Sequence, residues 1–159
     1  MWKRRAQWAA GLIILLAIVT VATAITLWRD RPDIHALGWT ATTETHAPTS
    51  DQVTVTWLGV TTLLFDDGET QLLIDGFISR PSLGDILLKR PVTNDVPTIN
   101  YAMNEYRMRR LAAIIPVHSH FDHAMDVGAI ANRSSASVLG SDSTHAIARG
   151  AGVPEDQLT

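Results

Sequence analysis

Three histidines and one aspartate lie within six consecutive positions of the stretch "PVHSHFDHAMD", residues 116–126. Residues two positions apart in an extended segment point to the same side, so His118 and His120 can present two imidazole nitrogens to a common point. Asp122 and His123 add a carboxylate and a third imidazole close by. Zinc and other borderline divalent metals accept this mixture of ligands. The pattern therefore predicts a metal site formed by His118, His120, Asp122 and His123.

The remaining histidines and the lack of cysteine narrow the chemistry further. His35, His46 and His145 are isolated in the sequence, and we interpret them as surface or hydrogen-bonding residues. The chain contains no cysteine, which excludes disulfides, thiolate ligands and a cysteine nucleophile. A metal must therefore be bound through nitrogen and oxygen. Such ligands suit zinc, and iron and manganese are alternatives because they accept the same ligands.

An uncharged segment, "AAGLIILLAIVTVATAITLW", occupies residues 9–28. About 20 apolar residues in a helix cross a hydrocarbon core of roughly 30 Å. We therefore expect a transmembrane helix at 9–28 after a basic segment at 1–8, with Trp8 and Trp28 at the two interfaces.

Lys3, Arg4 and Arg5 precede this segment, so the positive-inside rule predicts a cytoplasmic N-terminus. The chain would then be a single-pass membrane protein whose remaining residues are extracytoplasmic, in a periplasm for example. A cleaved signal peptide is the alternative, with "ATA" at residues 22–24 as the cleavage site. We favour a retained anchor because the apolar run continues through Trp28. Both interpretations place the domain on the same side of the membrane.

The charge of the remaining chain argues against nucleic acid as a partner. Without Lys3, Arg4 and Arg5, ten of the 13 Lys and Arg residues remain against 16 Asp and Glu. An acidic domain is repelled by phosphate backbones. One basic cluster, "YRMRR" at residues 106–110, is interpreted as the solvated face of a helix.

Hydrophobic alternation predicts where the folded domain begins. Residues 29–52 are rich in Thr, Pro, Asp and His and read as a linker, and the domain spans 53–159. Apolar and β-branched residues alternate at 53–57, 61–65 and 71–74, with "DDG" at 66–68 between the last two. This pattern predicts a meander of antiparallel strands.

The rest of the domain is expected to alternate helices and strands. Residues 77–100 form a long connection with a short helical piece at 83–88, and such connections often line active sites. The expected order after it is helix 104–113, strand 113–117, helix 124–133, strand 135–140 and helix 141–149. This α/β order places Asp122 and His123 at a helix N-terminus, above the carboxyl edge of the sheet.

The H-x-H-x-D-H signature of His118, His120, Asp122 and His123 resembles that of the metallo-β-lactamase superfamily of metal-dependent hydrolases. The block "TWLGVTTLLFDDGETQLLIDG", residues 56–76, is similar to the opening strands of that superfamily, which end in an aspartate that supports the metal site, here Asp75. The resemblance covers residues 53–159. It implies an αββα sandwich, of which this chain would contain the first half after one transmembrane helix.

The resemblance also implies roles for these residues. His118 and His120 would bind a first metal ion, and Asp122 and His123 a second. Asp75 would contact these ligands without binding the metal itself. One or two zinc ions would generate a metal-bound hydroxide that attacks an ester, lactone or phosphodiester. Asp122 would be the catalytic residue that orients or deprotonates the water.

Two departures from the superfamily pattern accompany the resemblance. Met125 and Asp126 occupy positions where small residues are expected, which leaves the branch of the superfamily open. The later ligands of the superfamily have no counterpart either, since His145 does not match them in position. We therefore expect a fragment whose site is completed by a missing C-terminal half or by a homo-oligomer.

Two functions follow as hypotheses. The first is a membrane-anchored metal-dependent hydrolase that acts on a small-molecule or lipid substrate. The alternative is a non-catalytic, membrane-tethered metal-binding domain that pairs with another chain through an open sheet. Half a sandwich would leave one sheet face uncovered, and an uncovered apolar face marks an interface.

Overall fold

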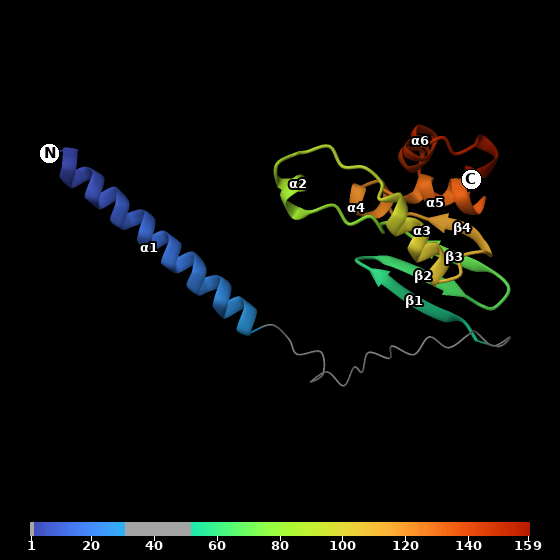
Figure 1. Cartoon of the computed structure of the whole chain (residues 1–159), viewed down its shortest axis with the longest axis horizontal. Helices are drawn as coiled ribbons and strands as arrows, with labels where there is room; N and C mark the ends of the chain where they lie inside the picture. The colour runs from blue at the N-terminus through green and yellow to red at the C-terminus, as the bar shows by residue number, and fades with distance from the viewer. Residues whose placement is uncertain (1, 31–51) are drawn as a thin grey trace. The chain divides into compact units, whose positions relative to one another are not determined.

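The computed structural model describes residues 2–30 and 52–159, and the chain divides into two compact units, residues 1–44 and 45–159 (Figure 1). Most of the predicted linker, residues 31–51, lies outside the described residues.

The first unit contains a single long helix, α1, from Trp2 to Arg29. It includes the predicted membrane segment 9–28, and it begins earlier than that segment because residues 2–8 are also helical. Its 28 residues correspond to a length of about 42 Å. The hydroxyls of Thr20 and Thr26 donate to the carbonyls of Leu16 and Ala22, at 2.9 and 3.0 Å, so these polar groups are satisfied within the helix. By length and composition, α1 can span a membrane or serve as a signal sequence.

The second unit is built on a five-stranded mixed sheet in the order β1-β2-β3-β4-β5 (Figure 1). Strands β1 (Thr54–Gly59), β2 (Thr62–Asp66) and β3 (Gln71–Ile74) are consecutive and antiparallel, which confirms the predicted meander. Strands β4 (Leu111–Ile115) and β5 (Ser137–Val138) then add in parallel. The parallel half brings the carboxyl ends of β3 and β4 to one edge of the sheet.

Helices connect β3 to β4 and β4 to β5. The bounds of the helices are α2 Leu83–Leu87, α3 Val96–Glu105, α4 Phe121–Ala124, α5 Val127–Ser134, α6 Asp142–Gly150 and the 3-10 helix η1 Glu155–Gln157. Helices α3 and α5 contribute buried side chains to one face of the sheet. Strand residues Leu73 and Ile114 are fully buried, as are Ile99 of α3 and Ile130 of α5, and all four belong to one apolar cluster. The domain is therefore a mixed α/β fold with its core between the sheet and the helices.

The opposite face of the sheet is also apolar but remains exposed in the described domain. Val55, Trp57 and Leu72 are 50%, 68% and 37% exposed. They belong to one face because Val55 pairs with Phe65 and Phe65 with Leu72, whereas buried Leu64 and Leu73 point to the core. An exposed apolar face of this kind agrees with the expectation of an uncovered sheet.

The predicted helix at 104–113 is wrong in position. Helix α3 begins at Val96, where the Asp95 side chain accepts from the backbone N–H of Thr98 at 3.1 Å and a proline lies in the first turn. Both features favour a helix start, so the long connection ends at Asp95. Residues 106–110 form a turn with Arg107 at a φ of 48°, and Met108 is buried within it. The basic cluster is therefore not the face of a helix.

Two other elements are shorter than predicted. The strand expected at 135–140 is reduced to Ser137–Val138, and the helix expected at 124–133 is divided into α4 and α5. The division has a local cause, because the Asp126 N–H donates to the Gly76 carbonyl at 2.8 Å instead of continuing α4.

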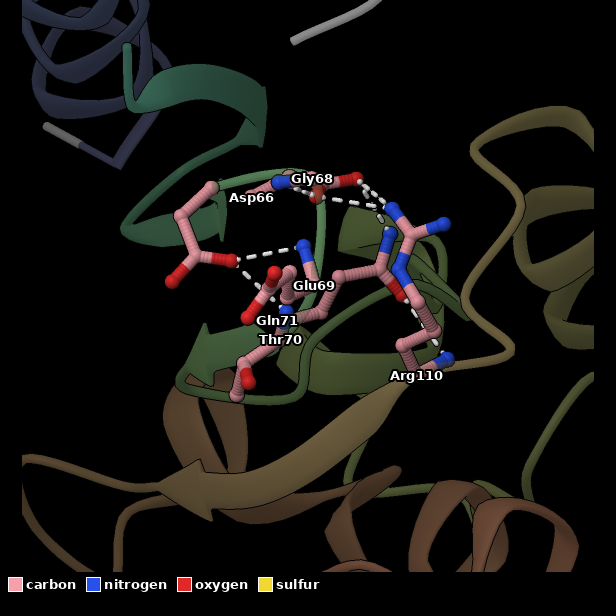
Figure 2. Close-up of polar contacts among 7 residues, drawn as sticks. Asp66, Gly68, Glu69, Thr70, Gln71 and Arg110 are labelled. Carbon is pink, nitrogen blue, oxygen red and sulfur yellow. Dashed lines mark hydrogen bonds and ion pairs between the residues drawn. The ribbon is translucent and has the colours of Figure 1, made fainter. Parts of the chain in front are cut away.

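A polar network ties the start of β4 to the hairpin between β2 and β3 (Figure 2). The Asp66 carboxylate accepts from the Arg110 guanidinium at 2.9 and 3.0 Å, from Gln71 Nε2 at 2.7 Å and from the Gly68 N–H at 2.8 Å. Burial would raise the pKa of Asp66, but the hydrogen bonds from Gly68, Gln71 and Arg110 and the charge of Arg110 together hold that pKa below its ordinary value.

We expect the Asp66 network to make folding stability pH-dependent. A carboxyl whose pKa is lower in the folded chain stabilises the fold above its unfolded pKa of about 3.9 and loses this contribution as the pH falls through the folded pKa. Asp66→Asn should therefore lower the free energy of unfolding by about 1–2 kcal/mol at neutral pH and flatten the loss below pH 4. Urea titrations of the full chain in detergent at several pH values measure this, with Glu69→Gln as the control. An unchanged pH profile in Asp66→Asn would contradict the prediction.

Candidate metal centre

The predicted metal ligands follow β4 directly. After Ile115 the chain bends through residues 117–120, and α4 begins at Phe121 with His120 at its N-cap position. Asp122 lies in the first turn of α4 and His123 in its last. This confirms the predicted position of Asp122 and His123 at a helix start beyond the carboxyl end of a strand. The segment is bent, however, whereas the spacing argument for His118 and His120 assumed an extended one.

The three histidines of the signature form one cluster of rings. His118 Nε2 and His120 Nδ1 are 3.0 Å apart, and the ring centroids of these residues are separated by 4.6 Å. The centroid of His123 lies 3.9 Å from that of His118. His118 and His120 are exposed, whereas His123 is buried. The structure thus brings the three imidazoles together at a site with one open side.

Asp75 fixes the buried member of this cluster. Its Oδ2 lies 2.8 Å from Nδ1 of His123, and its Oδ1 accepts from the Val117 N–H at 2.8 Å. The Asp75 side chain is fully buried. Because a carboxylate oxygen accepts, Nδ1 of His123 is the donor in this contact. The other ring nitrogen, Nε2, lies 3.6 Å from Oδ2 of Asp122.

The backbone around Asp75 is shaped by its position between two elements. Asp75 has a φ of 59°, and its N–H donates to the Ile115 carbonyl at 3.1 Å at the end of β4. The next residue, Gly76, donates to the His123 carbonyl at 2.6 Å. A Cβ on Gly76 would lie 2.8 Å from Cγ2 of Val127, so only glycine allows this approach. The turn after β3 therefore places the Asp75 carboxylate in contact with His123 of α4.

A second buried carboxylate, that of Asp126, lies at the start of α5. Its Oδ2 accepts from the N–H groups of Ile78 and Ser79, both at 2.7 Å. Its Oδ1 accepts from Ser79 Oγ at 2.6 Å and from Asn94 Nδ2 at 2.7 Å. The Asp126 side chain is fully buried. Asp126 is thus a structural anchor that fixes both ends of the long connection beside the site.

Sequence reasoning missed two features of this arrangement. Thr61 Oγ1 lies 3.2 Å from Nδ1 of His123, although 62 positions separate these residues in the chain. Asp126 was noted only as a departure from small residues. One signal could have identified it, since a carboxylate within the otherwise uncharged run "AMDVGAIAN" needs buried hydrogen-bond partners.

The donor set fits a metal ion in its chemistry and in one of its spacings. Two nitrogens bound to one tetrahedral zinc are about 3.3 Å apart. His118 Nε2 and His120 Nδ1 are hydrogen-bonded to each other at 3.0 Å, a separation near this value, and both rings are exposed. Within residues 2–30 and 52–159, however, no group of three or more His, Cys, Asp or Glu side chains is arranged to hold a metal ion. The site as described is therefore a facing pair of imidazoles beside the Asp122–His123 pair.

The other histidines are separate from this cluster or outside the described residues. His145 lies in α6, and its Nε2 is 3.1 Å from the carbonyl of Thr159. His35 and His46 lie outside the described residues.

No protein-family model matches the chain, and no curated protein matches it in sequence. The resemblance to the metallo-β-lactamase superfamily therefore stays a prediction that rests on the H-x-H-x-D-H signature and on residues 56–76.

The two neighbouring aspartates should respond differently to truncation. Asp126→Ala leaves two buried N–H groups and the Asn94 amide without their acceptor, so we expect a loss of about 3 kcal/mol or more in the free energy of unfolding. Asp122 is partly exposed, and Asp122→Ala should change that free energy by less than about 1 kcal/mol. Urea denaturation of the full chain in detergent compares them. Equal losses in both variants would contradict the assignment of Asp126 as the anchor.

Proposed function

We propose that this chain is a membrane-anchored, metal-dependent hydrolase of the metallo-β-lactamase superfamily that acts on an ester, lactone or phosphodiester. The observation that carries the proposal is the proximity of the His118 and His120 nitrogens, next to a His123 ring that a buried carboxylate orients. A carboxylate behind a histidine is the usual support of a metal-binding imidazole, because it fixes the tautomer and the ring position.

The ligands in this proposal are His118 and His120 for one ion, and Asp122 and His123 for a second. The nitrogen and oxygen donors favour zinc, with iron or manganese as alternatives. A bound divalent ion supplies Lewis acidity, which lowers the pKa of a coordinated water and polarises the oxygen of the substrate.

The chain's own residues provide position and proton transfer. Asp75 Oδ2 accepts from His123 Nδ1 and so presents the other ring nitrogen towards Asp122. Thr61 Oγ1 lies 3.2 Å from the same Nδ1, and this second contact restricts the orientation of the ring. Asp122 is the residue with a partly exposed carboxylate, and it orients the attacking water or takes its proton.

Helix α1 supports a location at the membrane. Its apolar length suffices for one crossing, and the basic residues before it favour a cytoplasmic N-terminus. The domain is then extracytoplasmic. An enzyme held at a membrane has access to lipid esters and phosphodiesters as well as to small molecules.

Elemental analysis of the purified full chain tests the metal site. We expect near-stoichiometric metal in the unchanged protein and at least a tenfold loss in the double variant His118→Ala/His120→Ala, because each variant position removes a nitrogen ligand. A phosphodiester and a lactone reporter are assayed on the same samples, and turnover should disappear together with the metal. His145→Ala is the matched control and should retain both. Metal content that is unaffected by the double variant would contradict the proposal.

A second candidate function rests on the apolar sheet face defined by Val55, Trp57 and Leu72. In this alternative the domain is non-catalytic, keeps a metal site, and pairs with another chain through the exposed face. A second copy of the same chain is the simplest partner to test.

Substitutions of two adjacent leucines in β3 distinguish an effect on self-association from an effect on folding. Leu73 is fully buried, so Leu73→Ala should cost about 2–5 kcal/mol in the free energy of unfolding. Leu72 is on the exposed face, so Leu72→Ser should leave that free energy within about 1 kcal/mol and weaken self-association at least tenfold if copies pair there. Sedimentation of the full chain in detergent over a dilution series measures the association. Identical sedimentation of Leu72→Ser and the unchanged chain would exclude pairing of copies through this face.

A further inference from the structure

The connection between β3 and α3 forms a closed loop whose two ends are fixed at one point. Ser79 at its start donates to the Asp126 carboxylate through both its N–H and its hydroxyl, and Asn94 at its end donates to the same carboxylate. The Ser79 hydroxyl also accepts from the Asp95 N–H at 2.7 Å. Residues 80–93 therefore project from a rigid base next to the candidate metal centre.

The far end of this loop is a short helix that exposes its apolar side chains. Leu83, Leu87 and Leu88 are 70%, 71% and 64% exposed. Ser82 caps the N-terminus of this helix, since its hydroxyl accepts from the Asp85 N–H at 3.1 Å. Large exposed side chains on a fixed, capped element are typical of a surface that enters an apolar phase.

Basic residues follow the apolar tip directly. Lys89 and Arg90 come immediately after Leu88, and both are exposed. The one acidic side chain of α2, Asp85, accepts from the Ser82 hydroxyl at 2.6 Å and pairs with Arg90 at 3.4 Å. Residues 80–93 contain Arg80, Lys89 and Arg90 against the single acidic Asp85, so the tip presents leucines next to a net positive charge. This composition suits apolar insertion below a layer of anionic headgroups.

The chain itself keeps the loop within reach of a membrane. Residues 30–51 connect α1 to the domain, and their covalent length cannot exceed about 80 Å in any conformation. A domain restricted to this distance from a bilayer meets the lipid surface at a high effective concentration, so that a small apolar tip suffices for contact.

We propose that residues 80–93 are a membrane-docking loop that inserts Leu83, Leu87 and Leu88 into an anionic phospholipid surface, with Lys89 and Arg90 at the headgroups. This inference rests on the membrane anchorage included in the proposed function, and it is independent of the metal chemistry. Docking gives the site a fixed position relative to the lipid surface, because Asp126, two residues after α4, joins the loop base to the segment that carries Asp122 and His123.

The lack of cysteine allows a direct test with the full chain. Leu87→Cys and Glu69→Cys each create one labelling position for a polarity-sensitive dye, the first at the loop tip and the second in the turn between β2 and β3. The two segments lie at opposite ends of the domain (Figure 1). The labelled proteins are reconstituted into vesicles of phosphatidylcholine with phosphatidylglycerol that contain a lipid with a nitroxide on its acyl chain.

We expect the nitroxide lipid to quench the dye at position 87 several-fold more than the dye at position 69. Adding Leu83→Ser/Leu88→Ser should abolish this difference, and adding Lys89→Glu/Arg90→Glu should reduce it severalfold. Vesicles of phosphatidylcholine alone should also give weaker quenching. The exposed positions of these side chains make the variants compatible with folding, which circular dichroism verifies.

Several results would overturn the inference. Equal quenching at both positions, in a chain that floats with the vesicles, would exclude loop docking and leave the anchor intact. Quenching that rises with the protein-to-lipid ratio would assign the tip to contact with a second copy. Equal quenching in both lipid mixtures would remove the requirement for anionic headgroups. A chain that fails to float with the vesicles would overturn the anchorage and the docking together.

Discussion

A carboxylate can be buried only when its oxygens are hydrogen-bonded. The sheet edge that carries the candidate metal centre depends on two buried carboxylates, those of Asp75 and Asp126. Asp75 uses one oxygen for the Val117 N–H and the other for His123, so it joins the ends of β3 and β4 to α4. Asp126 takes four hydrogen bonds and joins α5 to the loop that follows β3. Together they tie the irregular segments around the histidines to the ends of the strands.

The domain has an unequal distribution of apolar surface. One face of the sheet is packed under α3 and α5, while Val55, Trp57 and Leu72 stay exposed on the other, and Leu87 is exposed at the tip of the long loop. These surfaces call for different explanations. The sheet face is broad and regular, which suits another layer of protein, whereas the loop tip is small and flanked by Lys89 and Arg90, which suits a headgroup layer.

The sequence predicted those parts of the structure that depend on local patterns. Alternation located the three antiparallel strands, and helical spacing located the last helix, predicted at 141–149 and found at Asp142–Gly150. The start of α3 was missed because the apolar pattern of "NEYRMRRLAA" outweighed the cap and proline signals at Asp95 and Pro97. The uncharged run around Asp126 indicates a carboxylate that needs buried partners, but the partners themselves cannot be identified from the sequence, because Ser79 and Asn94 lie 47 and 32 positions away. Long-range hydrogen bonding leaves no periodic trace in a sequence.

The candidate site and the base of the long loop are joined by direct contacts. Asn94 donates to the Met125 carbonyl at 2.7 Å as well as to Asp126, so the loop's end is attached to the residue that follows α4. On its other side, Phe77 packs edge to face on Phe121 at 5.8 Å, next to His120. The base of the loop therefore contacts the chain at both ends of α4. These contacts join the loop base to the helix that carries Asp122 and His123.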